Sequence, residues 1–163
     1  CEMDKYINMD KILISFGTRP LAQRVWQLLQ PHFQLVYATA EPFPAVLKQQ
    51  AYQVLPEATA ATYAHELLKL CLDLGVQYVL PLGALELEPL HEARLLLEEY
   101  GVTLLVPMQR DNYMLINSPA KELPLALFHK GVNLLTGIKQ TDDDFSGVGL
   151  LSDSQEEVAL VLV

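Results

Sequence analysis

One stretch near the N-terminus, Lys11 to Glu41, constrains the fold more than any other part of the chain. It begins with a short apolar run, Ile12 to Phe16, which is typical of a strand buried on both faces. Gly17 follows directly, where the chain must turn sharply. Thr18 is suited to cap the N-terminus of a helix, and Pro20 fits the first helical turn because its missing N–H needs no partner there.

The residues after this turn complete a strand–helix–strand unit. Pro31 ends the helix, and Phe33 to Tyr37 begins a second strand. The apolar residues of the helix recur at the spacing of a single face: Leu21, Val25, Leu28 and Leu29. Such a unit is the first βαβ unit of a parallel sheet.

The same alternation continues toward the middle of the chain. Gly75 and Gly101 each stand where a helix should end and a Val-rich strand begin. We therefore predict an α/β fold, a Rossmann-like three-layer α/β/α arrangement with a mainly parallel sheet. The further segments are strand 51–55, helix 59–74, strand 76–82, helix 86–100 and strand 102–106.

The character of the sequence changes after Pro107. Asp111 is expected to cap a short helix over 113–116, and Ser118-Pro119 to start another that reaches Lys130 with a break at Pro124. Gly131 should end that helix, Leu134 to Ile138 is a strand candidate, and Thr141 to Gly147 should be an exposed acidic loop.

The last six residues, Val158 to Val163, are wholly apolar and must be buried in a sheet, a partner or a neighbouring domain. The organisation expected is thus an N-terminal extension (1–10), a Rossmann-like domain (11–110), and linker-like helices with a C-terminal apolar segment (111–163) in the same compact unit. A homodimer through that apolar segment is one expectation.

Charge and composition exclude several classes of partner. The net charge of −9 argues against a nucleic-acid or anionic-membrane surface, because affinity for phosphates needs clustered Lys and Arg. No apolar run approaches the ~18 residues of a membrane helix. Cys1 and Cys71 form no disulfide pattern, which favours a cytoplasmic protein with free thiols.

The order of elements predicts where a ligand would bind. Right-handed crossovers put the first two strands on one side of the sheet and the later strands on the other. A crevice then opens at the carboxyl ends of the first strand, at Gly17 and Thr18, and of the fourth, at Pro81 to Ala84. Backbone N–H groups at this turn, with Arg19, could hold an anion, although a purely structural turn is the alternative.

A dinucleotide site is a third alternative for this turn. Glu41 lies about 20 residues after the turn, where an acid that binds ribose would be expected. The Gly-x-Gly-x-x-Gly pattern is nevertheless absent, because Arg19 and Ala22 stand where glycines are wanted. The anion or ligand contact and the dinucleotide site both stay open at this point.

A second cluster of polar residues lies at the joint between the fourth strand and the next helix. Glu88 and Glu92 are spaced i,i+4, so they could form an acid–base or metal pair with His91 nearby. Acidic residues are also favoured in a first helical turn by the helix dipole alone. The four histidines form no ligand pattern, and Asp142 to Asp144 lack the spacing of a calcium loop. We name no catalytic residue and no metal ligand.

The order of these pieces resembles the N-terminal pre-ATP-grasp domain of biotin carboxylase, of carbamoyl-phosphate synthase large subunits and of related carboxylate–amine ligases. The resemblance covers about Lys11 to Val132 and rests most on LGVQYVLPLGALELEPLHEARLLLEEYGVTLLVP. The segment MLINSPAKELPLALFHKGV resembles the family's linking segment. There Asn117-Ser118-Pro119 stands where Asn-Asp-Lys is usual, and Lys121 is displaced.

The resemblance implies a function as well as a fold. In that family the domain shapes the acceptor-substrate pocket and packs on the ATP-binding domains, so an ATP-grasp domain or subunit is the expected partner. ATP and Mg²⁺ are expected only in those domains, and this chain alone is expected to be inactive, as a fragment or a split or degenerate homologue of a ligase. The alternatives are a free-standing Rossmann-like module for a nucleotide or small anionic metabolite, and a structural dimerisation subunit. By position, the crevice residues are Gly17, Thr18, Arg19, Gly83 and Glu86.

Overall fold

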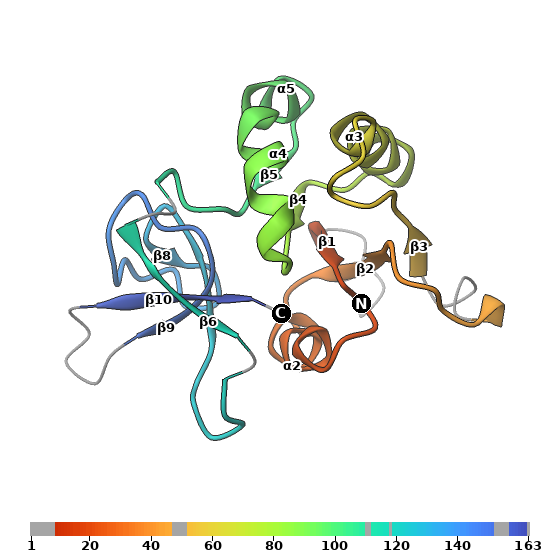
Figure 1. The fold of residues 1–163 in the computed structure, drawn as a ribbon. Coiled ribbons are helices and arrows are strands. Elements are labelled where there is room, and N and C mark those ends of the chain that lie inside the picture. The colour runs from red at the N-terminus through yellow and green to blue at the C-terminus, as the bar shows by residue number, and fades with distance from the viewer. Residues whose placement is uncertain (1–8, 47–51, 110–111, 118, 152–156, 163) are drawn as a thin grey trace.

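A computed structural model describes residues 9–46, 52–109, 112–117, 119–151 and 157–162. The chain forms two five-stranded sheets, with the helices gathered around the first (Figure 1). Residues 1–8 of the expected N-terminal extension and the caps at Asp111 and Ser118 lie outside the described residues.

The first sheet confirms the predicted α/β fold. Its order is β3-β2-β1-β4-β5, and every neighbouring pair is parallel. All five strands lie within the predicted segments or overlap them: β1 (Lys11–Ser15), β2 (Gln34–Thr39), β3 (Tyr52–Val54), β4 (Tyr78–Leu80) and β5 (Thr103–Leu104).

Side chains of β1 alternate between two cores, which is why this strand is apolar throughout. Leu13 packs into the core under the later helices, whereas Ile12 and Ile14 pack into the core that faces α2 (Pro20–Leu29). The other face is covered by α3 (Tyr63–Leu74), α4 (Leu87–Glu92) and α5 (Arg94–Glu99) (Figure 1). Helices therefore cover both faces of the first sheet, which gives the predicted three-layer α/β/α arrangement.

The structure corrects two details of the helices. Arg19, not Thr18, is the N-cap of α2, and no side chain caps this helix, although Pro20 does occupy its first turn. The helix expected over 86–100 is interrupted: a 3₁₀ turn, η2 (Ala84–Glu86), leads into α4, and Ala93, at φ −90° and ψ 3°, separates α4 from α5.

The linker-like helices expected after residue 111 are wrong. The described residues from 113 onward form no helix and instead build a second, mixed sheet of order β6-β10-β9-β7-β8. The strand expected over 134–138 is also wrong. The strand in this region is Val132–Asn133, which forms a hairpin with Ala126–His129. The strands are β6 (Met114–Asn117), β7 (Ala126–His129), β8 (Val132–Asn133), β9 (Gly147–Leu151) and β10 (Val158–Leu162).

Strand pairing explains why this region is not helical. β10 is apolar and rich in valine, and it pairs with β6 on one side and β9 on the other. A helix of four or five residues is marginal alone, so pairing decides the conformation of β6 and β7. Between β7 and β8 lies a two-residue turn, Lys130 at φ 51° and Gly131 at φ 80°, the geometry of a type I′ hairpin rather than a helix end.

The apolar C-terminal segment is buried inside its own sheet. Leu160, Val161 and Leu162 are each at most 2% exposed, between the two neighbouring strands. The expectation of burial is therefore met within the chain for these residues. A homodimer through this segment stays a prediction, without the exposed patch that motivated it.

The two sheets share their apolar cores. Phe128, Phe145 and Leu160 of the second sheet region cluster with Val79 and Leu104 of the first. A backbone bond from Met108 N–H to the carbonyl of Asp144, 3.0 Å, ties the β5–β6 connection to the loop before β9. In the acidic loop itself, Asp142 to Asp144 lie at the surface, whereas Phe145 and Ser146 are buried. No helix in the described part of the chain is long and apolar enough to cross a membrane.

Candidate functional site

The carboxyl ends of β1 and β4 lie side by side, where the sheet order changes direction. Ile14 of β1 pairs with Leu80 of β4, so the residues that follow each strand meet at one edge. In open parallel sheets this point is the usual place for a ligand crevice. The sequence predicted a crevice at this point, but none of its five predicted residues lines a pocket among the described residues.

A buried carboxylate fills the point between the two strands. Glu86, 4% exposed, accepts a bond from Ser15 Oγ at 2.5 Å and another from the Gly83 N–H at 3.1 Å, both on Oε2. Its other oxygen, Oε1, accepts the Tyr63 hydroxyl at 2.5 Å. Ser15 Oγ in turn accepts the Leu82 N–H at 2.7 Å. We call Ser15, Tyr63, Gly83 and Glu86 the switch-point cluster.

This cluster joins three elements that are far apart in the sequence. Ser15 ends β1, Tyr63 begins α3, and Glu86 closes η2. Burial raises the pKa of Glu86, and the three donors oppose that rise. The pKa of Tyr63 is also raised, first by burial and then by the charge of Glu86. A carboxylate of the protein itself thus lies between the ends of β1 and β4, bonded to groups from three elements.

The backbone around Gly17 is held by close packing. A Cβ at Gly17 would lie 2.6 Å from Cβ of Tyr37, so the chain approaches β2 too closely for any side chain. The positive φ at this turn belongs to Phe16, at 52°, and not to Gly17. The ring of Phe16 lies where a Cβ at Gly83 would project, so both glycines of the predicted crevice serve close contacts. Tyr37 also stacks on Tyr52 of the edge strand β3, with ring centroids 4.8 Å apart.

Thr18 and Arg19 are exposed at the surface, directly before α2. Arg19 forms a two-bond ion pair with Glu41, through Nε at 2.8 Å and Nη2 at 2.7 Å, and its guanidinium lies 5.9 Å from the centre of the Phe16 ring. The hydrogen bond raises the pKa of Arg19 and lowers that of Glu41. Both side chains are substantially exposed, 45% and 34%, so a ligand can compete for either partner.

The turn offers few groups to a phosphate. The Gly17 N–H bonds to the Ala38 carbonyl and the Arg19 N–H to that of Phe16, while Pro20 has no N–H. Glu41, the expected ribose acid, is paired with Arg19. These contacts oppose the dinucleotide alternative.

A small pocket lies beside this ion pair, at the carboxyl ends of β1 and β2 and the residues that follow β3. Its volume is about 290 Å³, and its walls are mainly apolar. Leu85, 74% exposed, forms one wall at the mouth. We call it the β1–β3 pocket, and it is lined by Phe16, Ala40, Glu41, Pro42, Glu57, Ala58, Thr59 and Leu85.

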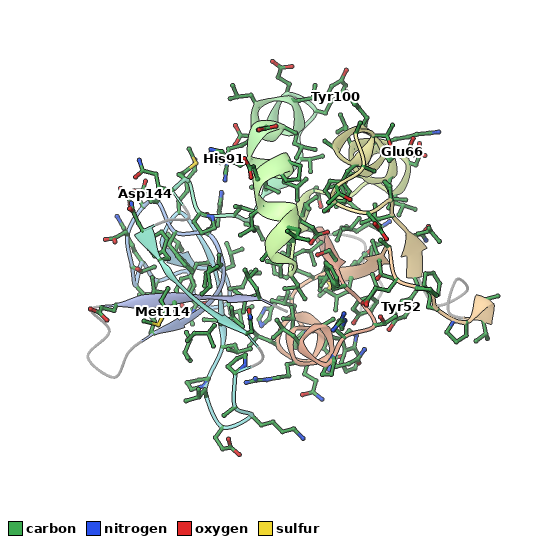
Figure 2. The ribbon with its side chains drawn as sticks, viewed as in Figure 1. Tyr52, Glu66, His91, Tyr100, Met114 and Asp144 are labelled. Atoms are coloured by element: carbon green, nitrogen blue, oxygen red, sulfur yellow. The ribbon has the colours of Figure 1, made fainter. Side chains whose placement is uncertain are left out.

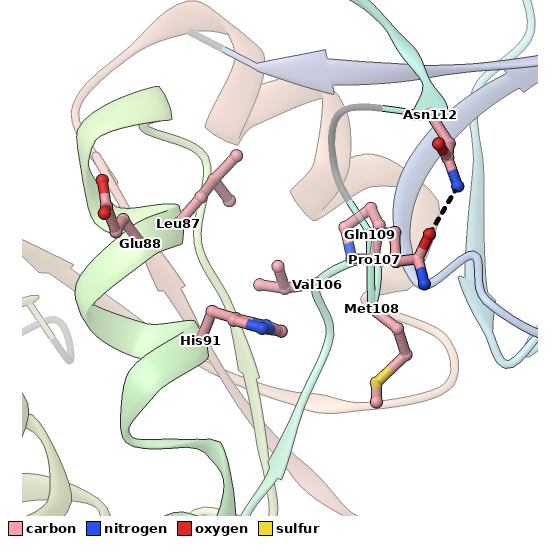
Figure 3. Close-up of a pocket in the computed structure, with 8 residues that line it drawn as sticks. All are labelled: Leu87, Glu88, His91, Val106, Pro107, Met108, Gln109 and Asn112. Atoms are coloured by element: carbon pink, nitrogen blue, oxygen red, sulfur yellow. Dashed lines mark hydrogen bonds between the residues drawn. The ribbon is translucent and has the colours of Figure 1, made fainter.

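A larger pocket lies between α4 and the connection that follows β5 (Figure 3). Its volume is about 490 Å³. His91 points from α4 across the pocket toward Val106 (Figure 3). We call it the α4 pocket, and it is lined by Leu87, Glu88, His91, Val106, Pro107, Met108, Gln109 and Asn112.

The predicted acidic pair on α4 is divided between two surfaces. Glu88 and His91 line the α4 pocket, whereas Glu92 lines a different hollow beside α3. Among the described residues, no three His, Cys, Asp or Glu side chains gather as metal ligands.

Two members of the switch-point cluster were not predicted as site residues. Ser15 lies inside the predicted strand 12–16 and Tyr63 inside the predicted helix 59–74, and neither was singled out. A polar residue at the end of an otherwise apolar strand was the available signal for Ser15. Tyr63 could not be linked to Glu86 without the packing of α3 over the sheet.

No known protein family matches the chain, and no curated protein does either.

Proposed function

We propose that this chain is the substrate-side portion, of the pre-ATP-grasp type, of an ATP-dependent carboxylate–amine ligase similar to carbamoyl-phosphate synthase. The observation that supports this most is the β1–β3 pocket, which opens at the carboxyl edge of a parallel sheet beside the Arg19–Glu41 pair. A further support is the all-parallel order β3-β2-β1-β4-β5 over the stretch that resembles this family.

The pocket suits a small acid or amine better than a nucleotide. A substrate carboxylate can replace Glu41 on Arg19 in a two-bond geometry, and a substrate amine can replace Arg19 on Glu41. The apolar walls, Phe16 and Leu85 among them, would hold a short aliphatic body. In this proposal the switch-point cluster does not touch the substrate but fixes the strand ends that form the pocket.

A series of matched small molecules tests the binding step on the full chain. Butyrate, butylamine and 2-aminobutyrate share one carbon chain and differ only in their charged groups. We expect 2-aminobutyrate to shift backbone amide signals at Phe16, Glu41 and Leu85 at lower concentration than either other compound. Arg19→Gln should remove this advantage, whereas Lys69→Gln, on the exposed surface of α3, should preserve it. Equal binding of all three compounds, or an unchanged response in Arg19→Gln, would refute the proposed substrate site.

The nucleotide is held elsewhere in this proposal, on an ATP-grasp domain or subunit that is the expected partner. Titration of the chain with ATP and Mg²⁺ by calorimetry should show no tight binding, because a triphosphate with its metal needs several cations and carboxylates. A micromolar, magnesium-dependent dissociation constant would instead favour the free-standing nucleotide module. A cytoplasmic location remains part of the proposal and agrees with the free, buried thiol of Cys71.

A further inference from the structure

The α4 pocket has the features of a preformed binding site that is separate from the proposed substrate pocket. Its volume of about 490 Å³ falls within the range of small-molecule sites. The two pockets share no lining residue, and each is built on different strand ends and helices. An inference about this pocket therefore does not rest on the proposed function.

Hydrogen bonds hold the wall opposite α4 in place. Arg94 Nη2 donates to the carbonyl of Val106 at 2.8 Å, and the Met108 N–H donates to the carbonyl of Asp144 at 3.0 Å. The first bond fixes the strand end to α5, and the second fixes the connection to the second sheet. The pocket wall is thus held from both sides before any ligand arrives, which reduces the ordering that binding would require.

The interior of the pocket favours a flat aromatic body. Leu87, Val106 and Pro107 are buried and form an apolar floor. Met108, 47% exposed, presents a thioether at the edge, and sulfur–aromatic contacts are favourable. The His91 ring, which points into the pocket, offers a face for stacking (Figure 3).

The rim favours polar groups on that body. Asn112 Nδ2 donates to Gln109 Oε1 at 2.9 Å, and a backbone bond between the same two residues, 3.1 Å, fixes their turn (Figure 3). This bond leaves the hydrogens of Gln109 Nε2 for a ligand acceptor, while a ring nitrogen of His91 can bond a second polar group across the pocket. Glu88 places a carboxylate in the lining of the pocket, which disfavours an anionic ligand by charge repulsion.

We propose that the α4 pocket binds a small, uncharged nitrogen heteroaromatic compound, with its ring on the apolar floor and its polar groups between Gln109 and His91. Nicotinamide is a suitable probe because it has a ring nitrogen and an amide at separate edges. Benzamide lacks only the ring nitrogen, so its comparison with nicotinamide tests the hydrogen bond to that nitrogen. Nicotinate replaces the amide by a carboxylate, so its comparison with nicotinamide tests the effect of a negative charge.

Methyl-labelled methionine provides the readout on the full chain. The methyl of Met108 lines the α4 pocket, whereas Met114, 71% exposed on β6, lies outside it and serves as an internal control (Figure 2). Met108→Leu assigns the signal. Nicotinamide should shift the Met108 signal by the ring current and leave Met114 unchanged, and it should bind more tightly than benzamide and nicotinate.

A pair of variants tests the role of Gln109. Gln109→Leu should weaken the binding of nicotinamide about three- to tenfold, which is the effect of losing one hydrogen bond. The variant should then bind nicotinamide with an affinity close to that of the unmodified chain for benzamide. Gln27→Leu makes the same change on the exposed face of α2 and should have no effect. The proposal is wrong if nicotinamide leaves Met108 unshifted, if benzamide or nicotinate binds as well as nicotinamide, or if Gln109→Leu binds nicotinamide like the unmodified chain.

Discussion

The hydroxyl of Tyr63, at the start of α3, donates a 2.5 Å hydrogen bond to Oε1 of Glu86, which lies beyond the end of β4. The bond joins a helix to the edge of the sheet from which the candidate site is built. Both groups are buried, at 2% and 4% exposure, so water does not replace the contact if one partner is lost.

Tyr63→Phe tests the strength of that bond. It removes one donor to a buried carboxylate and should lower the free energy of unfolding by about 1.5–3 kcal/mol, as for hydrogen bonds to charged groups. Urea denaturation followed by circular dichroism provides the measurement. Tyr100→Phe, at a side chain that is 56% exposed, is the matched control and should change stability little. A loss in Tyr63→Phe no larger than in the control would show that the carboxylate does not need this donor.

The close approach at Gly17 gives a second prediction. In Gly17→Ala the new methyl would meet Cβ of Tyr37 at 2.6 Å, so β1 and β2 must separate locally. We expect a loss of about 1–3 kcal/mol, the usual cost of overpacking, together with disturbed signals around the β1–β3 pocket. Thr18→Ala, next to it and exposed, serves as the control. Equal unfolding midpoints for the two variants would contradict the packing argument.

His129 should make stability depend on pH. Burial lowers its pKa below the ordinary 6.5, and the charges of Lys130 and Arg94 lower it further, while Glu98 acts in the opposite direction. The unfolded chain therefore binds the proton more readily than the folded chain, and stability should fall as pH drops below about 6.5.

Denaturant unfolding at a series of pH values tests this dependence. Between about pH 7 and pH 5 the unmodified chain should lose more unfolding free energy than His129→Gln does. The variant should therefore gain in stability relative to the unmodified chain as the pH falls. His65→Gln, at an exposed position on α3, controls for the loss of a histidine as such. A difference that stays constant over this range would rule out His129 as the source.

The position of β10 inside the second sheet gives a fourth prediction. Leu160 is 2% exposed, and Leu160→Ala should cost about 2–5 kcal/mol, as for other large-to-small changes in a core. Leu115→Ala, on the neighbouring strand β6 and 48% exposed, should cost much less. Thermal unfolding, with light scattering at each step, measures stability and the oligomeric state together. Similar losses in the two variants would mean that β10 is not an interior strand.

Much of the first half could be predicted because its signals are local. The apolar run at Ile12 to Ile14 and the glycines that end the helices at Gly75 and Gly101 are each read from a few neighbouring residues. Right-handed crossovers then predicted the first two strands on one side and the later strands on the other, and β1 does pair with β4. The same local signals picked out Gly17 and Gly83, and both glycines stand at close contacts in the structure.

The second half could not be predicted in this way. Segments such as β6 and β7 are four residues long, and neither forms a stable element alone. Their conformation depends on β10 and β9, which lie tens of residues further along the chain. A periodicity argument over such short segments cannot distinguish a helix from a strand, and the expected caps at Asp111 and Ser118-Pro119 suggested the wrong one.

The sequence by itself predicted the α/β fold and its parallel sheet, because apolar periodicity and turn residues are encoded locally. The tertiary structure alone decided which groups meet at the ends of its strands. It brought Ser15, Tyr63 and Glu86 together across three elements, paired Arg19 with Glu41, and formed the α4 pocket against the connection to the second sheet. These contacts join residues that are distant in the chain, and long-range packing sets their geometry.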